Sequence, residues 1–250
     1  MYREFDAPSV QEMLGIDAED TPDGLILHGI YDMPQQARHW RDRLANARVA
    51  RKAFNIVIGK HHGRTLWYAP VLGGPMAALV VHCAAVLGVQ GIIQIGSFGG
   101  TQRGLNVGEL LLVTNAGRGE AASDWYLEPD VPAEADETFT QAIRDLLTAR
   151  ELDWHEGSVF TTSAFMAEER EDILRWESDG YVGVEMEAAT TFAIAQHFGV
   201  PSACLIYLLD NLIEDQHLLG ISKIEQEQIQ QSRKLVEELA LDAIISFTSS

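Results

Sequence analysis

The longest apolar stretch of the chain, residues 75–96, constrains its fold more than any other segment. It reads PMAALVVHCAAVLGVQGIIQIG and is long enough to imitate a membrane span. However, His82, Gln90 and Gln94 interrupt it, and two glycines lie within LGVQG. A buried helix, a short turn and a buried strand explain this pattern better. We therefore expect no membrane partner, and a strand that is covered on both faces.

Apolar runs alternate with helical patterns along the rest of the chain. Runs typical of buried strands lie at residues 24–31, 54–71, 91–96, 108–116, 154–163 and 201–210. Patterns typical of helices lie at residues 34–50, 73–89, 137–151, 167–180, 181–200 after an extended start, and 222–247. This alternation predicts a three-layer α/β/α fold. We assign the polar, acidic residues 1–22 to an N-terminal arm and residues 23–250 to a single domain.

An excess of acidic residues limits the partners of this protein. Its 250 residues include 18 Lys and Arg against 37 Asp and Glu, which gives a formal net charge of −19. Nucleic-acid binding needs clustered basic side chains, and the sequence contains no basic stripe, so we exclude a nucleic-acid partner. An anionic substrate must enter a local pocket of cationic or amide groups, because the overall field repels it.

Cysteine and histidine usage indicates neither a disulfide nor a metal site. Cys83 and Cys204 lie in apolar runs, where buried free thiols are expected. His61 and His62 lie in a predicted turn without a helix-spaced acid nearby. The first ten residues lack an apolar signal-peptide core. We therefore expect a cytoplasmic protein with no metal and no cofactor.

Acidic side chains interrupt apolar sequence at two places. Glu185 and Glu187 flank Met186 where an apolar strand passes into an apolar helix, and alternate positions of an extended segment point to one face. Two buried carboxylates are costly unless they bind something, although the helix dipole also favours such a pair. Asp210 ends an apolar strand, where open α/β sheets place ligands. Burial there suits a general acid; a helix N-cap is the alternative.

Five segments, in this order, resemble the nucleoside phosphorylase superfamily. That group contains purine nucleoside phosphorylases, uridine phosphorylases and methylthioadenosine/adenosylhomocysteine nucleosidases. The segments are LGGPMAALVVH (72–82), IGSFGG (95–100), FTTSAFM (160–166), GVEMEAA (183–189) and LLDNL (208–212). The resemblance implies a central mixed sheet that is partly barrel-like. It also implies a homo-oligomer, a dimer or a hexamer, in which neighbouring chains complete the pocket.

The resemblance also implies roles for single residues. Glu187 matches the residue that binds the ribose hydroxyls, and Met186 the one that packs on the sugar. Phe165, which by itself reads as a core residue, matches the ring that stacks on the base, and the backbone at Met166 would read the base edge. Asp210 matches the acid that protonates purine N7, so a purine nucleoside is the expected substrate.

One segment of the sequence leaves the identity of the nucleobase undecided. FMAEERED also resembles, with one residue deleted, the uridine phosphorylase segment that reads uracil through a glutamine and an arginine. Arg170 matches that arginine, and Glu168 replaces the glutamine. A pyrimidine or an unusual base therefore stays an alternative to a purine.

The side of the pocket that faces the nucleophile departs from the family pattern. The resemblance places Ser97, Phe98 and Gly99 along the sugar and the nucleophile. Phosphorylases of this family hold phosphate with arginines, yet two of those positions carry Gln36 and Gln94 here. Each lost charge-assisted hydrogen bond is replaced by a neutral one of about half the strength. Phosphate as a co-substrate is therefore in question.

A hydrolytic reaction is the hypothesis that follows from this departure. Asp32 stands where the family has a flexible glycine, and the nucleosidases of the superfamily use an acid near this loop to activate water. We expect Asp32 to act as the base and Asp210 as the acid. A third phosphate arginine, which is given across a dimer interface, falls near Arg51 or Lys52. The alternatives are a phosphate-dependent uridine or purine nucleoside phosphorylase with an altered anion site, and a non-catalytic nucleoside-binding homologue.

Overall fold

A single mixed sheet of ten strands runs through the residues that the structure describes, 2–52 and 56–248 of a computed structural model. The strands are β1 (Gly24–Gly29), β2 (Ala45–Val49), β3 (Val57–His61), β4 (Arg64–Val71), β5 (Gly91–Gly100), β6 (Leu110–Gly119), β7 (Ala133–Glu134), β8 (Trp154–Thr162), β9 (Gly183–Glu185) and β10 (Ser202–Asn211). Their order is β10-β6-β8-β9-β5-β1-β4-β3-β2, with β7 beside β6, and β10 also pairs with β5. Five strands thus close into a ring, which confirms the partly barrel-like sheet.

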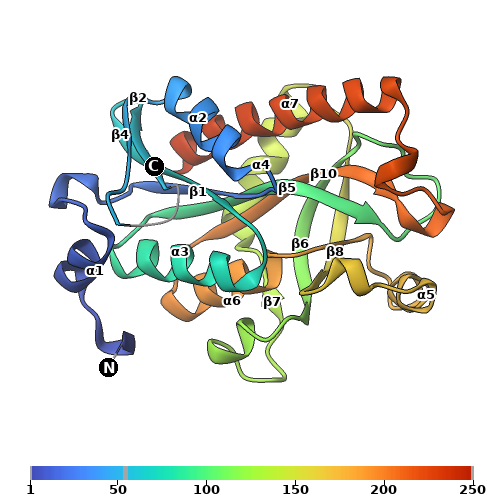
Figure 1. Cartoon of the computed structure of the whole chain (residues 1–250), viewed down its shortest axis with the longest axis horizontal. Helices are drawn as coiled ribbons and strands as arrows, with labels where there is room; N and C mark the ends of the chain where they lie inside the picture. Colours follow the sequence, from blue (N-terminus) through green and yellow to red (C-terminus); the bar gives the residue numbers. More distant parts are fainter. Residues whose placement is uncertain (1, 53–55, 249–250) are drawn as a thin grey trace.

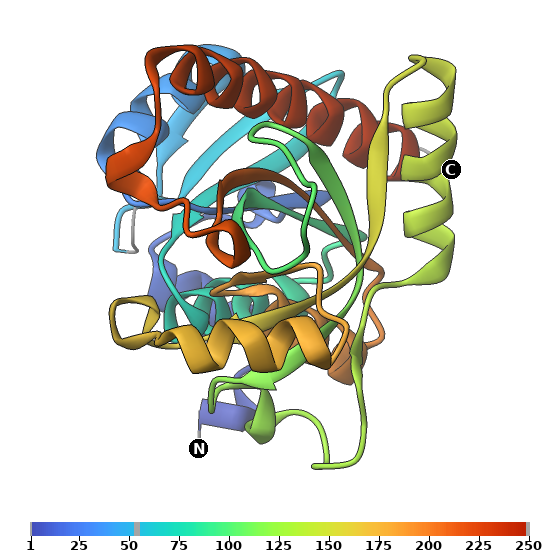
Figure 2. The same ribbon diagram turned by 90° about the vertical axis from the view of Figure 1, so that its right-hand side faces the viewer.

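Helices cover both faces of this sheet (Figure 1). They are α1 (Ala7–Leu14), α2 (Met33–Arg43), α3 (Gly74–Val86), α4 (Glu137–Ala149), α5 (Arg170–Ser178), α6 (Ala188–Phe198) and α7 (Lys223–Thr248). Figure 1 shows α2 and α7 on one side of the strands and α3 and α6 on the other, and Figure 2 shows α7 above the strands with α5 below them. Ile93 and Ile95 join the core under α7, whereas Ile92 joins the core under α3, as the alternation of a strand requires. The predicted three-layer fold is confirmed.

The long apolar stretch folds into a helix, a turn and a strand, as its pattern predicts. α3 ends at Val86, Gly88 adopts a left-handed φ of 85° in the turn, and β5 begins at Gly91. Across the described part of the chain, no helix combines the length and the apolar character that crossing a membrane requires.

β5 continues further than the sequence predicts, through the small residues 95–100. β10 pairs with β5 along its length, and β9 pairs with the last two residues of β5 in the antiparallel direction. A Cβ atom at Gly99 would lie 2.7 Å from Cδ1 of Leu212, and one at Gly183 would collide with the ring of Phe98. Small residues are needed here because strands approach closely where the ring closes, so the strand predicted over residues 91–96 extends to residue 100.

The helix predicted over residues 34–50 is shorter in the structure. α2 ends at Arg43, Leu44 is extended with φ −102° and ψ 136°, and Asn46 has a left-handed φ of 55°. The chain then forms β2, which pairs with β3. All of β2 is exposed or half-buried, so the alternation of Ala45, Ala47 and Val49 with Asn46 and Arg48 does not mark a buried face. Its pairing satisfies backbone groups at the edge of β3.

Candidate active site

A cavity of about 250 Å³ opens where the carboxyl ends of β1, β5 and β10 meet the start of α6. Its walls come from the loop after β1, from β5, from β9 and the turn after it, from β10 and from α7. The structure brings together most of the predicted site residues along this cavity: Ser97, Phe98, Gly99, Phe165, Glu185, Met186, Glu187 and Asp210. They come from four separate segments of the chain: residues 97–99, residue 165, residues 185–187 and residue 210.

Glu187 lies at the start of α6, and only 5% of it is exposed. Its Oε1 accepts a hydrogen bond of 2.5 Å from the backbone N–H of Gly73. Gly73 adopts a left-handed φ of 81°, which favours glycine. A Cβ atom at Gly29 would collide with Oε2 of Glu187, so glycine is needed there as well. Burial, and then the charge of Glu185, raise the pKa of Glu187.

Glu185 is held by a set of donors. It accepts hydrogen bonds from Oγ1 of Thr161 at 2.5 Å, and from the backbone N–H groups of Glu187 at 2.7 Å and Ala188 at 2.8 Å. Burial raises the pKa of Glu185, and these hydrogen bonds oppose that change. The carboxylate therefore fixes the turn that carries Met186 and Glu187 into the cavity.

Gln94 supports Glu185 and does not line the cavity. It is 1% exposed, its Nε2 donates to Oε2 of Glu185 at 3.0 Å, and its Oε1 accepts from Oγ1 of Thr191 at 2.7 Å. Side chains alternate along β5, so Gln94 points toward α6 whereas Ser97 points toward the α7 side. Gln94 therefore lies outside the lining of this cavity, and its predicted place in the phosphate or water site stays a prediction.

Asp210 is 5% exposed and lies opposite Gly99 at the end of β10. The register shifts between Leu208 and Asp210, and such an irregularity can turn a side chain toward a site. Burial raises the pKa of Asp210 to about 6, although the charge of His217 and the backbone N–H of Leu218 oppose the change. Asp210 thus retains a proton closer to neutral pH than an exposed aspartate does.

Phe165 and Glu168 form another part of the cavity wall. The ring of Phe165 meets that of Tyr31 edge to face, with centroids 5.8 Å apart. Oε1 of Glu168 is buried and has no hydrogen-bond partner among the described residues. Burial, and then the charges of Asp172 and Asp210, raise the pKa of Glu168 to about 7.

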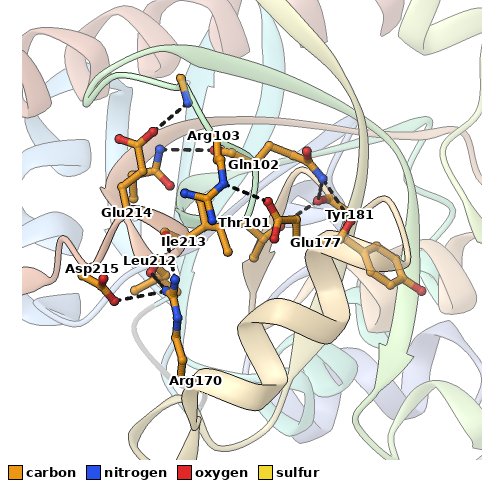
Figure 3. Close-up of polar contacts among 12 residues, drawn as sticks. Thr101, Gln102, Arg103, Arg170, Glu177, Tyr181, Leu212, Ile213, Glu214 and Asp215 are labelled. Carbon is orange, nitrogen blue, oxygen red and sulfur yellow. Dashed lines mark hydrogen bonds and ion pairs between the residues drawn. The ribbon is translucent and has the colours of Figure 1, made fainter.

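Arg170 does not line the cavity, and the predicted role of the Met166 backbone stays a prediction. The side chain of Arg170 donates to the carbonyl oxygens of Leu212 at 2.8 Å and Ile213 at 2.9 Å, and its Nη1 lies 3.2 Å from Oδ1 of Asp215 (Figure 3). It braces the 3₁₀ turn η5 (Leu212–Glu214) and does not line the cavity. Met166 is 84% exposed and is also absent from the lining. The first turn of α5 directs Arg170 toward η5, which the sequence pattern does not reveal.

The predicted residues of the nucleophile side are dispersed, apart from Ser97. Asp32 is an exposed N-cap residue of α2, and its Oδ1 accepts from the backbone N–H of Gln35 at 3.2 Å. It follows the lining residues 29–31 but does not line the cavity itself. Nε of Arg51 donates to the carbonyl oxygen of Gly15 at 2.7 Å, which fastens the segment after α1. Neither Asp32 nor Arg51 of this chain therefore faces the predicted sugar site.

Gln36 is buried in α2, where it lines a second cavity of about 430 Å³ between α2 and α7. Its Oε1 has no partner among the residues that the structure describes. Arg233 of α7 lines this second cavity and the first one. Gln36 therefore lies beside the first cavity rather than within its wall.

Arg233 was missed by the sequence analysis. Within the described lining of the first cavity it is the only arginine or lysine. Its Nε donates to the hydroxyl of Tyr207 at 3.2 Å, and Nη1 and Nη2 have no partner among the described residues. The hydroxyls of Tyr207 and Tyr68 and the carboxylate of Glu237 raise its pKa despite burial. Arg233 belongs to a helix rich in polar residues, where no motif distinguishes it.

The cysteines and histidines outside the cavity form no evident site. Cys83 and Cys204 are buried and free. His61 and His62 lie at the turn between β3 and β4, with ring centroids 4.5 Å apart. Over residues 2–52 and 56–248, no group of three or more His, Cys, Asp and Glu side chains is arranged to hold a metal ion.

Comparison with known proteins agrees with the motifs. A family model described as Phosphorylase superfamily matches residues 29–246. The guanosine phosphorylase of Halorubrum lacusprofundi is 28% identical over 166 residues, which cover 65% of this chain and 68% of that protein. The uridine phosphorylase of Thermococcus kodakarensis is 27% identical, and the match covers 58% of this chain and 57% of that protein. The chain thus spans less than two thirds of the Thermococcus protein.

The fold has close structural neighbours. A crystal structure of uridine phosphorylase from Vibrio fischeri ES114 superposes with a TM-score of 0.82 and covers 94% of this chain and 97% of that chain. The sequence identity to it is 20%. At this identity the likeness shows the arrangement of strands and helices alone.

Proposed function

Because this chain belongs to the phosphorylase superfamily, we propose that it cleaves the N-glycosidic bond of a purine nucleoside. The observation that carries the proposal is Asp210, a buried acid that faces the same cavity as Glu187. Cleavage leaves negative charge on the base and positive charge on the sugar. An acid with a pKa of about 6 can donate its proton to the departing base. A purine offers N7 as the acceptor.

The neighbouring residues support a role in binding the sugar. The carboxylate of Glu187 offers oxygen acceptors, and the hydroxyls of a ribose are matching donors. Hydrogen bonds from the sugar would favour the charged form of Glu187, whose pKa burial has raised. Met186 lies beside it in the lining, where it can pack on the apolar face of the ring.

We propose that phosphate is the nucleophile that attacks the sugar and takes the ribosyl group from the base. Arg233 supports this choice, because two of its guanidinium nitrogens are unpaired among the described residues and because it lines the cavity. Tyr207, which accepts from Arg233, is the neighbour of Ser97 across β10 and β5. A cation and a hydroxyl near each other are suitable partners for an oxyanion. The Halorubrum and Thermococcus relatives also bear the names of phosphorylases.

Hydrolysis is the second candidate, and Gln36 and Gln94 favour it. Both are neutral where the resemblance expects phosphate-binding arginines, although neither lines the first cavity in this chain. A hydrolytic reaction needs a general base that activates water, and Asp32 is the residue predicted for that role. Its exposed position as the N-cap of α2 gives this version less support than Arg233 gives to phosphorolysis.

Turnover of guanosine, inosine, adenosine, methylthioadenosine and uridine, each with and without phosphate, tests the proposal. We expect ribose 1-phosphate to form from purine nucleosides only when phosphate is present. Free ribose released without phosphate would instead support hydrolysis. A nucleoside that binds tightly and is recovered unaltered would contradict both reactions and indicate a binding protein.

Two variants separate the nucleophiles. Arg233→Met should raise KM for phosphate about ten- to a hundredfold, the equivalent of one charge-assisted hydrogen bond, and change KM for the nucleoside little. Asp32→Asn is the matched control and should leave phosphorolysis unchanged. If Asp32→Asn abolishes turnover while Arg233→Met does not affect it, the hydrolytic version is correct.

A further inference from the structure

We propose that Gln216 is a positioning residue for Asp210: its side-chain amide connects the backbone beside Asp210 to the start of α7 and so holds residues 217–218 against the carboxyl group. This inference rests on the proposed function, because it concerns the acid of that reaction. Gln216 is absent from the lining that the described residues give the first cavity, so it acts through Asp210 and not on the ligand.

Gln216 and Asn211 close the turn that follows β10, over residues 211–216. The backbone N–H of Gln216 donates to the carbonyl oxygen of Asn211 at 3.1 Å, and the backbone N–H of Asn211 donates to Oε1 of Gln216 at 3.0 Å. Asn211 directly follows Asp210 and is 2% exposed. Gln216 therefore holds both backbone polar groups of Asn211, and the N–H among them belongs to the peptide bond with Asp210.

The other polar atom of the Gln216 amide reaches α7. Its Nε2 donates to Oε1 of Glu225 at 2.7 Å, and Oε2 of Glu225 accepts from the backbone N–H of Ser222 at 2.7 Å. A carboxylate acceptor makes the bond from Gln216 stronger than a bond between neutral groups. Glu225 lies in the first turn of α7, so a single amide connects the end of β10 with the start of that helix.

The backbone of this turn has a conformation that needs such a closure. Asp215, next to Gln216, adopts a left-handed φ of 59°, which is unfavourable for a residue other than glycine. The side chain of Asp215 pairs with Arg170, which also donates to the carbonyl oxygens of Leu212 and Ile213 (Figure 3). Arg170 thus supports the middle of the turn, whereas Gln216 holds its two ends together.

The two residues that follow Gln216 act on Asp210. Leu218 lines the first cavity together with Asp210, and its backbone N–H donates a hydrogen bond to the carboxyl group. Burial raises the pKa of Asp210, and the charge of His217 and this hydrogen bond oppose the change. The chain enters this segment through Gln216, so the contacts that Gln216 makes determine where the two groups lie.

Other charged groups also surround Asp210. The cavity wall contributes Glu168, Glu185, Glu187 and Arg233, and the turn contributes the exposed Glu214 and Asp215. The four groups of the wall belong to β9, α6, α7 and the segment before α5, so a looser turn leaves them in place, and water screens the two exposed ones. What changes is the hydrogen bond from Leu218 and the distance to His217. Since both favour the ionised acid, their loss should raise the pKa of Asp210.

Gln216→Met tests the proposal, with Gln226→Met as its matched control. Nε2 of Gln226 donates to the carbonyl oxygen of Ile221 at 3.3 Å, so the control removes an amide near the start of α7 without loosening β10. An acid must hold its proton to donate it, so the pH at which kcat falls to half should rise by about one unit in Gln216→Met. Gln226→Met should keep the wild-type midpoint. A merely structural role would lower kcat or Tm and leave the midpoint in place.

Carbon-13 NMR of the carboxyl groups gives a second measurement that needs no turnover. The signal of Asp210, identified by its loss in Asp210→Asn, should titrate at a higher pH in Gln216→Met than in the wild-type protein and the control. A midpoint that stays constant, that falls, or that moves equally in both variants would overturn the role of Gln216. A raised Asp210 titration in a protein that cleaves no nucleoside would support the positioning role and refute the proposed function alone.

Discussion

At the scale of single residues, three buried carboxyl groups of the cavity differ in their partners. Glu185 accepts hydrogen bonds from side chains and backbone. Glu187 accepts one from Gly73 and otherwise faces the cavity. Burial raises the pKa of Asp210, and the charge of His217 and a hydrogen bond from the backbone N–H of Leu218 oppose this change. Burial raises the pKa of all three. Because its donors hold it, Glu185 fixes the turn, whereas Glu187 and Asp210 are available to a ligand in the cavity.

The role of Asp210 as an acid predicts the pH dependence of the reaction. The group must hold a proton to donate it, so kcat should fall as pH rises through about 6. Asp210→Asn should lower kcat about a hundredfold to ten-thousandfold and change the binding of the nucleoside little. A pH–rate profile together with nucleoside binding by calorimetry checks both. A profile in which activity rises through pH 6 would contradict the assignment.

The carboxyl groups of the cavity could be predicted from the sequence, but the residues that lie around them could not. Glu185, Glu187 and Asp210 could be predicted because acids within apolar runs are rare and local. Gln94 could not be placed, because its function depends on Glu185, which is distant in the sequence. Arg233 carries no local signal at all. Such partners are chosen by the packing of elements, not by neighbours in the chain.

At the scale of elements, the short turn η5 depends on a side chain from α5. Arg170 donates to two carbonyl oxygens of η5 and pairs with Asp215. Gln102 reaches the same α5 from the end of β5, by donating to the carbonyl oxygens of Glu177 and Tyr181 (Figure 3). These contacts connect α5 with the ends of β5 and β10, which carry the cavity wall.

Arg170→Met should therefore destabilise the fold and loosen the cavity wall. Loss of its hydrogen bonds to η5 is expected to lower the free energy of unfolding by about 1–3 kcal/mol, partly offset because water can reach the carbonyl groups. KM for the nucleoside should rise as well, because Leu212 lines the cavity. Urea unfolding and steady-state kinetics measure the two effects.

The matched control lies on the same helix. Arg175 pairs with Asp172 at the surface, so Arg175→Met should change the free energy of unfolding by no more than about 0.5 kcal/mol. If Arg170→Met is as stable as this control and its kinetics are unchanged, Arg170 does not brace η5 in solution.

At the scale of the whole molecule, the dominant feature is the net charge of −19. Repulsion among acidic groups destabilises a compact chain, and salt screens it. Raising NaCl from about 0.1 M to about 1 M shortens the Debye length from about 10 Å to about 3 Å. We expect Tm to rise, by about 2–4 °C for each kcal/mol of repulsion that is relieved.

Thermal unfolding at increasing NaCl, with sucrose of equal osmolality as the control, checks this expectation. A Tm that stays constant or falls with NaCl would show that surface ion pairs, which salt also screens, matter more than the overall repulsion. Sedimentation under the same conditions tests the homo-oligomer, a dimer or a hexamer, that the family resemblance implies.

The sequence by itself determined the three-layer fold, the motifs of the superfamily and the acids of the cavity. These depend on apolar periodicity and on rare residues in short segments, which act locally along the chain. Only the tertiary structure decided that Gln94 holds Glu185, that Arg170 braces η5, and that Arg233 and Glu168 face the cavity. Whether a polar side chain faces a ligand or a neighbouring element depends on which elements pack together, and that is settled only when the ring of strands closes.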